Sequence, residues 1–302
     1  MGHRGRDGTP VTTVCCDRCG MVFISPLPTQ SELEQYYRTR YREDYKGTYE
    51  PRRKHVYRAA QSALLRWQRL DALGRRKGTV LDVGAGGGEF LYLMHRLGFE
   101  TIGVEPHAGY AGFARRAYGL EIIEGPIQAL NLEPARYDII TVHHVLEHLP
   151  DPVTALSRLR KSLRAGGVLL VEVPNIRARY HSPATRFHRA HLMSFSAETL
   201  IAAAAAAGLG LLDLQLVPGV EHLNAAFTQA TPTTALPTSQ HAREIVGLLN
   251  EHDELNHFTT VAPYRRLAAN LARPVREAIA LTGYRDARSM LDALYHDVSL
   301  KS

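Results

Sequence analysis

The sequence predicts an α/β fold built on a doubly wound, mostly parallel sheet, with an N-terminal arm and a C-terminal helical extension. Short apolar or β-branched runs alternate with helical segments between residues 79 and 217. A glycine-rich turn at residues 84–88 joins the first run to the first helix. Such alternation gives parallel strands joined by right-handed crossovers. Ligands are then expected at the carboxyl ends of the strands.

Residues 1–74 are predicted to form the arm. Residues 1–14 show no apolar periodicity and are expected to lack regular structure. Cys16 and Cys19 form one CxxC pair. Zinc usually takes four ligands from two such pairs, so a reduced thiol pair is favoured and a bound metal remains the alternative. Three cysteines within residues 15–19 exclude a disulfide framework.

Two helices are expected in the rest of the arm. The first starts at Gln30, and the second is a basic amphipathic helix over residues 51–73. Between and within them lie Tyr37, Tyr41 and Tyr45. These rings either pack the arm on the core or form an aromatic lid over cofactor and substrate, since each ring has an apolar body and a polar tip.

Residues 75–218 are predicted to form the core. Its first strand is the apolar run that starts at Thr79 and ends at Asp82, before the glycine turn. A helical stripe then follows, formed by Phe90, Leu93, Met94 and Leu97. The following strands are expected at residues 101–104, 120–123, 137–142, 168–173 and 209–217, and helices at 108–118, after Asp151-Pro152 and after Ser196.

The glycine turn indicates the kind of ligand. A dinucleotide site prefers G-x-G-x-x-G, but Glu89 occupies the third glycine position and would repel a pyrophosphate. Asp82 at the strand end suits an ammonium or sulfonium charge. Glu105, closing the next strand, can accept both ribose hydroxyls. The turn therefore favours S-adenosylmethionine over a nicotinamide dinucleotide.

Three motifs in order carry a family resemblance. They are DVGAGGGEFL at residues 82–91, YDIITVHHVLEHLPDP at 137–152 and LRAGGVLLVEVPN at 163–175. The chain resembles the class I methyltransferases, especially bacterial small-molecule enzymes akin to the ubiquinone-biosynthesis O-methyltransferase. The resemblance implies a Rossmann-like fold, S-adenosylmethionine as cofactor and methylation of a small molecule.

The turn and the resemblance together give a set of expected cofactor-binding residues. They are Asp82, Gly84, Ala85, Gly86, Glu105, Pro106, His107, Gln128 and His143. The resemblance places an adenine-binding acid after Gly125, but Pro126 stands there, so Gln128 or backbone would have to serve.

Histidines are the candidate general bases, because the pKa of imidazole lies near neutrality. His144 and His148 follow the strand at residues 137–142, and His191 follows a polar insert. If the turn is helical, His144 and His148 are i, i+4 neighbours. With Glu147 they could also ligate a divalent ion, zinc rather than magnesium. A purely structural role for Glu147 and His148 is the other reading, and no metal is assigned.

The flanking segments bear on the substrate. The insert at residues 174–195 contains Arg186 among several arginines and histidines, which could grip an anionic substrate or be solvated. Residues 219–302 are expected to form a linker and two or three helices. These helices would pack on the core, mediate a homodimer or select the substrate.

Composition limits the class of protein. The net charge of +6 does not by itself indicate nucleic acid binding. The sequence contains no apolar run of about 20 residues and no signal-peptide core near its start, which predicts a cytoplasmic protein without membrane contact. O-methylation in biosynthesis, with a histidine base, is the favoured reaction. Methylation at carbon or nitrogen, methylation of RNA, and a non-catalytic cofactor-binding subunit remain open.

Overall fold

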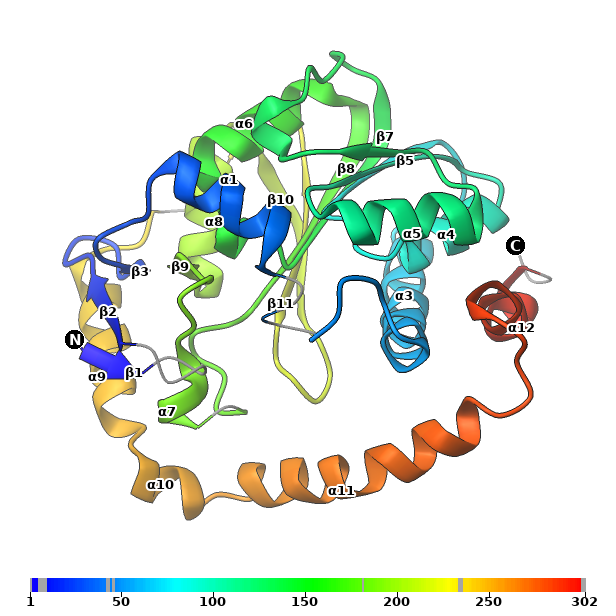
Figure 1. Ribbon diagram of the computed structural model, residues 1–302. Coiled ribbons are helices and arrows are strands. Elements are labelled where there is room, and N and C mark those ends of the chain that lie inside the picture. Colours follow the sequence, from blue (N-terminus) through cyan, green and yellow to red (C-terminus); the bar gives the residue numbers. More distant parts are fainter. Residues whose placement is uncertain are drawn as a thin grey trace. The chain divides into compact units, whose positions relative to one another are not determined.

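The computed structural model describes residues 2–4, 10–41, 44, 47–180, 182–232 and 236–299 (Figure 1). The chain divides into two compact units. The glycine-turn unit comprises Pro28–Thr141, Ser162–Gly167 and Arg273–Ser302. The histidine unit comprises Met1–Leu27, Val142–Lys161 and Val168–Ala272.

A seven-stranded sheet confirms the predicted α/β class, with the strand order β10-β11-β8-β7-β4-β5-β6. The strands are β4 (Thr79–Val83), β5 (Glu100–Glu105), β6 (Ile122–Glu124), β7 (Tyr137–His143), β8 (Leu163–Val173), β10 (Gly210–Leu216) and β11 (Leu223–Thr228). Strands β4, β5 and β6 are parallel, whereas β11 is antiparallel to both its neighbours. Strand β11 was not predicted, because residues 219–302 were expected to form a linker and helices.

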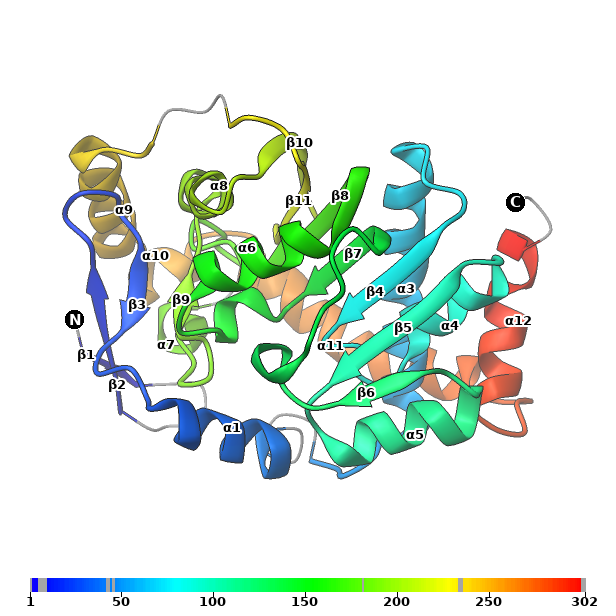
Figure 2. The ribbon, with the colours of Figure 1, turned by 90° about the horizontal axis from the view of Figure 1, so that it is seen from above.

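In the glycine-turn unit, the helices that follow β4 and β5 pack on the parallel strands, because their apolar residues recur every three or four positions. Its helices are α1 (Gln30–Thr39), α3 (Arg53–Ala72), α4 (Glu89–Arg96), α5 (Ala108–Tyr118), η1 (Ile127–Ala129) and α12 (Ala287–Ser299). Val56, Ala60 and Leu70 of α3 are fully buried. Figure 2 shows β4, β5 and β6 side by side, with α5 beside β6. The predicted spans of α3 and α5 are confirmed.

The histidine unit contains η2 (Leu146–His148), α7 (Pro183–Arg186), α8 (Ala197–Ala206), α9 (Ser239–Glu251), α10 (Glu254–Phe258) and most of α6 (Pro152–Ser162). A second sheet has the order β1-β2-β3-β9, formed by Gly2–Arg4, Pro10–Cys15, Val22–Ile24 and Met193–Ser194. The expectation that residues 1–14 lack regular structure was therefore wrong for residues 2–4 and 10–14. Val11 and Thr13 alternate with exposed residues and are buried, which is the period of a half-buried strand.

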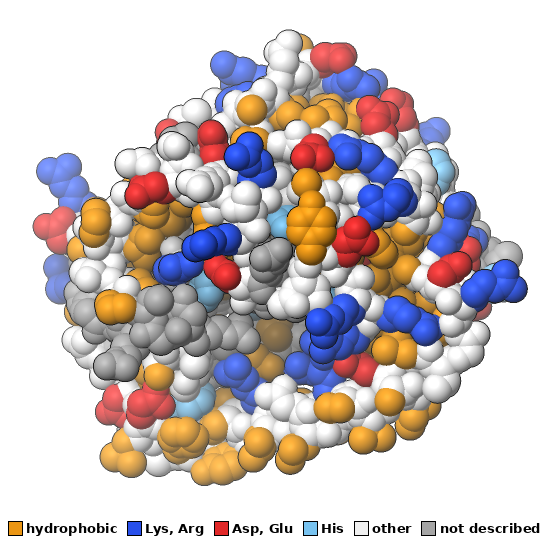
Figure 3. Space-filling view, in the orientation of Figure 1, with side chains coloured by type: hydrophobic (Ala, Val, Ile, Leu, Met, Phe, Trp, Pro, Cys, Tyr) orange, Lys and Arg blue, Asp and Glu red, His pale blue; other side chains and the backbone are white. Residues whose placement is uncertain are grey.

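The C-terminal extension holds four helices over the described residues, rather than two or three, because α10 is a short separate turn. Helix α11 (Ala262–Ala280) has a row of exposed apolar side chains, seen along the lower edge in Figure 3. The row includes Tyr264, Leu267, Leu271, Val275 and Ile279. Within the described residues, no helix combines the length and apolar character needed to cross a bilayer.

Candidate functional site

The glycine turn between β4 and α4 bends through a left-handed backbone. Gly84, Gly86 and Gly88 have φ values of 76°, 60° and 85°, a region that residues with a Cβ atom rarely adopt. The N–H groups of Gly84 and Ala85 donate to the carbonyl oxygen of Val104, at 2.8 and 2.9 Å. These bonds hold the turn to the end of β5.

Two buried carboxylates flank this turn. The Asp82 carboxylate accepts a 2.7 Å hydrogen bond from the Thr141 hydroxyl. The Glu105 carboxylate accepts from the backbone N–H groups of Gly86 at 2.8 Å and His107 at 3.1 Å. Both acids lie at the carboxyl ends of adjacent parallel strands. The sequence predicted this pairing, which suits a cationic ligand with ribose hydroxyls.

Two glycines of the turn are packed closely by side chains of the protein itself. A Cβ atom added at Gly87 would come within 2.4 Å of the Glu89 carboxylate, and one at Gly88 within 2.8 Å of Ala114. A side chain is therefore excluded at Gly88, where the neighbour is the short side chain of Ala114, whereas at Gly87 the end of the Glu89 side chain would have to move. Ala85 is buried against the turn, whereas Pro106 is half-buried.

His107 and Gln128 occupy different settings. His107 is completely buried and caps α5, since its Nδ1 accepts from the Tyr110 N–H at 3.4 Å. Its ring lies 5.2 Å from the ring of Tyr49. Gln128 is exposed on η1. His143 belongs to the histidine unit, as the buried last residue of β7. Adenine contacts by these residues stay a prediction.

The predicted lid residues fall in separate places. Tyr37 and Tyr41 lie edge to face, with ring centroids 5.1 Å apart, and both also contact Tyr36. Tyr45 lies outside the described residues. Arg186 is in the histidine unit, where its guanidinium contacts His252, and burial lowers its pKa to about 10. Its role in gripping a substrate stays a prediction.

His144 is held between two carboxylates. Its Nε2 lies 2.9 Å from Oε1 of Glu172, and its Nδ1 lies 3.3 Å from Oε1 of Glu147. Burial lowers the pKa of His144, but Glu147 and Glu172 outweigh it and raise this pKa to about 9. Burial by itself would raise the pKa of Glu147, but the hydrogen bond from His144 outweighs burial and lowers this pKa to about 2. A protonated imidazole between two carboxylates is therefore favoured at neutral pH.

His148 and His191 form a second group with Glu147. The Nδ1 of His148 lies 2.7 Å from the carbonyl oxygen of Ala190, and the His148 and His191 rings are 4.9 Å apart. A carbonyl can only accept, so Nδ1 carries the proton and Nε2 is left as an acceptor. Burial and the neighbouring His148 lower the pKa of His191 to about 3. His144 and His148 do not share a helical face, because η2 is a single 3-10 turn.

Two residues of this region were missed from the sequence. Glu172 and His222 lie with His144 so that one ligand atom from each is within 4.8 Å of the others. Glu172 had a signal, as the one charge in the apolar run 168–173. His222 had no such signal in the sequence, because it precedes β11, a strand that was not predicted.

The cysteine pair lies in the turn between β2 and β3. The N–H of Gly20 donates to the carbonyl of Cys16, and the Cys16 N–H donates to that of Met21, both at 2.9 Å. All three cysteines are free thiols. Hydrogen bonds from the backbone of Arg18 and Cys19 lower the pKa of Cys16. Whether this pair holds a metal stays a prediction.

The comparison with protein families identifies the chain. A family model described as a methyltransferase domain matches residues 52–214, more than half of the chain. The chain belongs to the methyltransferase-domain family. The assignment confirms the predicted class I methyltransferase fold, and it confirms S-adenosylmethionine as the cofactor for which the glycine turn and its carboxylates are suited.

The chain is also similar to individual proteins. Ubiquinone biosynthesis O-methyltransferases from Serratia proteamaculans and Pectobacterium carotovorum are 36% and 34% identical over 98 and 122 residues. The matches cover 30% and 37% of this chain but only 39% and 48% of those proteins. The chain thus spans less than half the length of these relatives. A solved 1,6-didemethyltoxoflavin-N1-methyltransferase from Burkholderia thailandensis, 22% identical, covers 72% of this chain and 94% of its own, with a TM-score of 0.49.

Proposed function

We propose that the protein transfers a methyl group from S-adenosylmethionine to a hydroxyl of a small molecule. In this reaction the acceptor oxygen forms a bond to the methyl carbon while the S–CH₃ bond breaks. The products are a methyl ether and S-adenosylhomocysteine, and a base takes the hydroxyl proton. The observation that carries the proposal is the left-handed glycine turn with Asp82 and Glu105 at its two sides.

The cofactor supplies a strong methyl electrophile, so the residues here have to hold and orient it. Asp82 is suited to bind the ammonium group of the methionine end, and Glu105 the ribose. Thr141 fixes the Asp82 carboxylate, and the Gly86 N–H fixes that of Glu105. Alignment of two reactants can lower a barrier by about 7–11 kcal/mol. The carboxylates are therefore expected to matter more than any base.

His148 is the base that the hydrogen bonds favour. The Ala190 carbonyl accepts from Nδ1 and fixes the proton there, so Nε2 is the nitrogen of the neutral imidazole that can take the proton of the acceptor hydroxyl. His144 is less suited, because the two carboxylates raise its pKa to about 9 and keep it protonated at pH 7. His191 is neutral at pH 7, since its pKa is lowered to about 3, and this makes it a weak base. The O-methyltransferase names of the relatives support a hydroxyl as acceptor.

Cofactor binding and turnover test the proposal separately. Calorimetry with S-adenosylhomocysteine is expected to show binding that Asp82→Asn and Glu105→Gln weaken. No binding of that ligand, together with binding of a nicotinamide nucleotide, would refute the cofactor assignment.

The second measurement is release of S-adenosylhomocysteine, followed by mass spectrometry across phenols, catechols and sugars. With an accepted substrate, His148→Ala is expected to lower kcat by about 10²–10⁴-fold. His296→Ala, at an imidazole with 65% of its side chain exposed, is the matched control and should not change it. Unchanged turnover in His148→Ala would refute the base assignment.

A further inference from the structure

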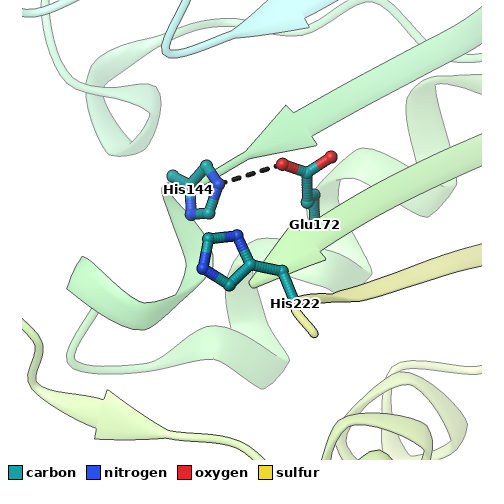
Figure 4. A group of neighbouring side chains, drawn as sticks. All are labelled: His144, Glu172 and His222. Carbon is teal, nitrogen blue, oxygen red and sulfur yellow. Dashed lines mark ion pairs between the residues drawn. The ribbon is translucent and has the colours of Figure 1, made fainter. Parts of the chain in front are cut away.

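Three side chains from different elements of the histidine unit point toward one another (Figure 4). His144 directly follows β7, Glu172 lies in β8, and His222 directly precedes β11. The His144 and His222 rings have centroids 4.8 Å apart, and the His144 Nε2 is 2.9 Å from the Glu172 Oε1. Two ligands of one tetrahedral zinc, each about 2.0–2.2 Å from the ion, lie about 3.4 Å apart. The His144–Glu172 contact is shorter than this, and the ligand atoms of all three residues lie within 4.8 Å of one another, so a shared ion requires only small movements of these side chains.

Further contacts orient two of these side chains as metal ligands are oriented. The Glu147 carboxylate lies 3.3 Å from Nδ1 of His144, so Nε2 faces Glu172, and zinc binding would release the proton that Nε2 carries in the metal-free protein. The Asn224 amide donates to Oε2 of Glu172 at 3.1 Å, which leaves Oε1 to face His144. In metal sites a ligating imidazole typically donates its other nitrogen to a carboxylate, and a ligating carboxylate is itself hydrogen-bonded. Both arrangements occur here.

The backbone also holds the group in place. His144 has a φ of 55°, which is uncommon for a residue with a side chain and is often found at functional sites. Its N–H donates to the carbonyl oxygen of Glu172 at 2.8 Å. On the other side, the Val217 N–H donates to the carbonyl of His222 at 2.8 Å, closing the hairpin between β10 and β11. Each side chain is therefore presented from a fixed main chain.

We propose that His144, Glu172 and His222 bind one zinc ion. Two imidazoles and a carboxylate suit zinc, whereas magnesium and calcium prefer oxygen ligands. Three protein ligands leave a fourth position for water or a ligand oxygen, as in catalytic zinc sites. The His144 side chain is 34% exposed and His222 is half-buried, so that position can be reached from solvent. This site goes beyond the proposed function, because zinc binding needs neither cofactor nor acceptor.

A second group nearby, Glu147 with His148 and His191, fits an ion less well. Its closest carboxylate–imidazole pair, Glu147 Oε1 and His148 Nε2, is 4.0 Å apart, compared with 2.9 Å for Glu172 and His144. The Oε1 of Glu147 is also engaged with Nδ1 of His144. Glu147 therefore serves better as the partner that orients His144 than as a ligand.

The test is zinc affinity of the full chain. The protein is stripped with a chelator and titrated with zinc against a competing chromophoric chelator. The wild type is expected to bind one zinc per chain. His222→Ala and Glu172→Gln should weaken binding by more than about 100-fold, and Glu147→Gln by about 10–100-fold, the range for a lost outer partner. His296→Ala is the matched control and should bind as the wild type does.

Cobalt(II) gives a second readout, since a three-ligand site should yield visible absorption bands that His222→Ala abolishes. Circular dichroism of each stripped variant identifies those that do not fold. If His222→Ala and Glu172→Gln do not fold, the zinc affinity of Glu147→Gln is the measurement that tests the proposal. Stoichiometric zinc retained by a folded His222→Ala but lost in His191→Ala would overturn the assignment in favour of the second group. No zinc binding by wild type would overturn it altogether. S-adenosylhomocysteine affinity, measured in parallel, keeps this result separate from the methyltransferase proposal.

Discussion

A methyl group added at Gly88 should destabilise the protein more than the same group at Gly98. The two glycines have nearly the same left-handed φ, 85° and 87°, so an alanine meets the same backbone strain at either position. That strain costs about 1–2 kcal/mol. At Gly98 nothing lies within 4 Å of the added Cβ atom, whereas at Gly88 it would lie 2.8 Å from both Ala114 and Leu120. Overpacking of this kind typically costs a further 1–3 kcal/mol or so.

We therefore expect Gly88→Ala to lower the free energy of unfolding by about 2–5 kcal/mol and Gly98→Ala by about 1–2 kcal/mol. Urea unfolding followed by tryptophan fluorescence measures the difference. The single tryptophan, Trp67, lies in the glycine-turn unit with its ring 6.0 Å from Phe99, so the signal reports on the unit that contains both glycines. Two variants within about 0.5 kcal/mol of each other would refute the claim that close helix packing excludes a side chain from the turn.

Two further predictions concern buried and half-buried charges of the same unit. Thr141→Val removes the 2.7 Å hydrogen bond from the Thr141 hydroxyl to the buried Asp82 carboxylate and should lower the free energy of unfolding by about 1.5–3 kcal/mol. An equal loss in Thr101→Val, the same change on β5, would contradict this reasoning. Arg58 holds the pKa of Glu277 below its usual value through hydrogen bonds of 2.5 and 2.8 Å. Since the folded-state pKa is depressed, this stabilisation is present above about pH 4.5 and is lost as the pH falls below it. Unfolding at pH 7 and pH 3 should show Glu277→Gln less stable than wild type by up to about 1 kcal/mol only at pH 7, and an equal gap at both would contradict the assignment.

Much of the fold could be predicted because its strands are short, β-branched and bounded by glycine. The predicted helix 108–118 has the bounds that the structure gives, and β4 covers the run before the glycine turn that was predicted as a strand. Strand β2 was missed because its buried positions are Val11 and the polar Thr13, so its apolar residues do not alternate. Strand β11 was missed because Asn224 and two alanines weaken its pattern. Both strands depend on pairing with distant segments, which a local pattern does not report.

In the candidate site, too, local features were predicted and contacts between distant segments were not. Asp82, Glu105 and the glycines follow from one local turn, and the sequence located them. His144, His148 and His191 were recognised as candidates by residue type, yet their surroundings come from elsewhere in the chain. Glu172 and Ala190 set their protonation and tautomer, and neither contact has a signature in the spacing of residues.

Strand β11 decides how short a working chain can be. It lies between β8 and β10 in the sheet and pairs with both strands, so β10 is joined to β8 only through β11. A chain ended at residue 218, the predicted core boundary, would leave the main-chain donors of β8 open to solvent and to other molecules. An uncovered apolar strand of this kind invites edge-to-edge aggregation. Expression trials of a minimal domain should therefore extend beyond Thr228, and insolubility of any shorter fragment would say nothing about catalysis.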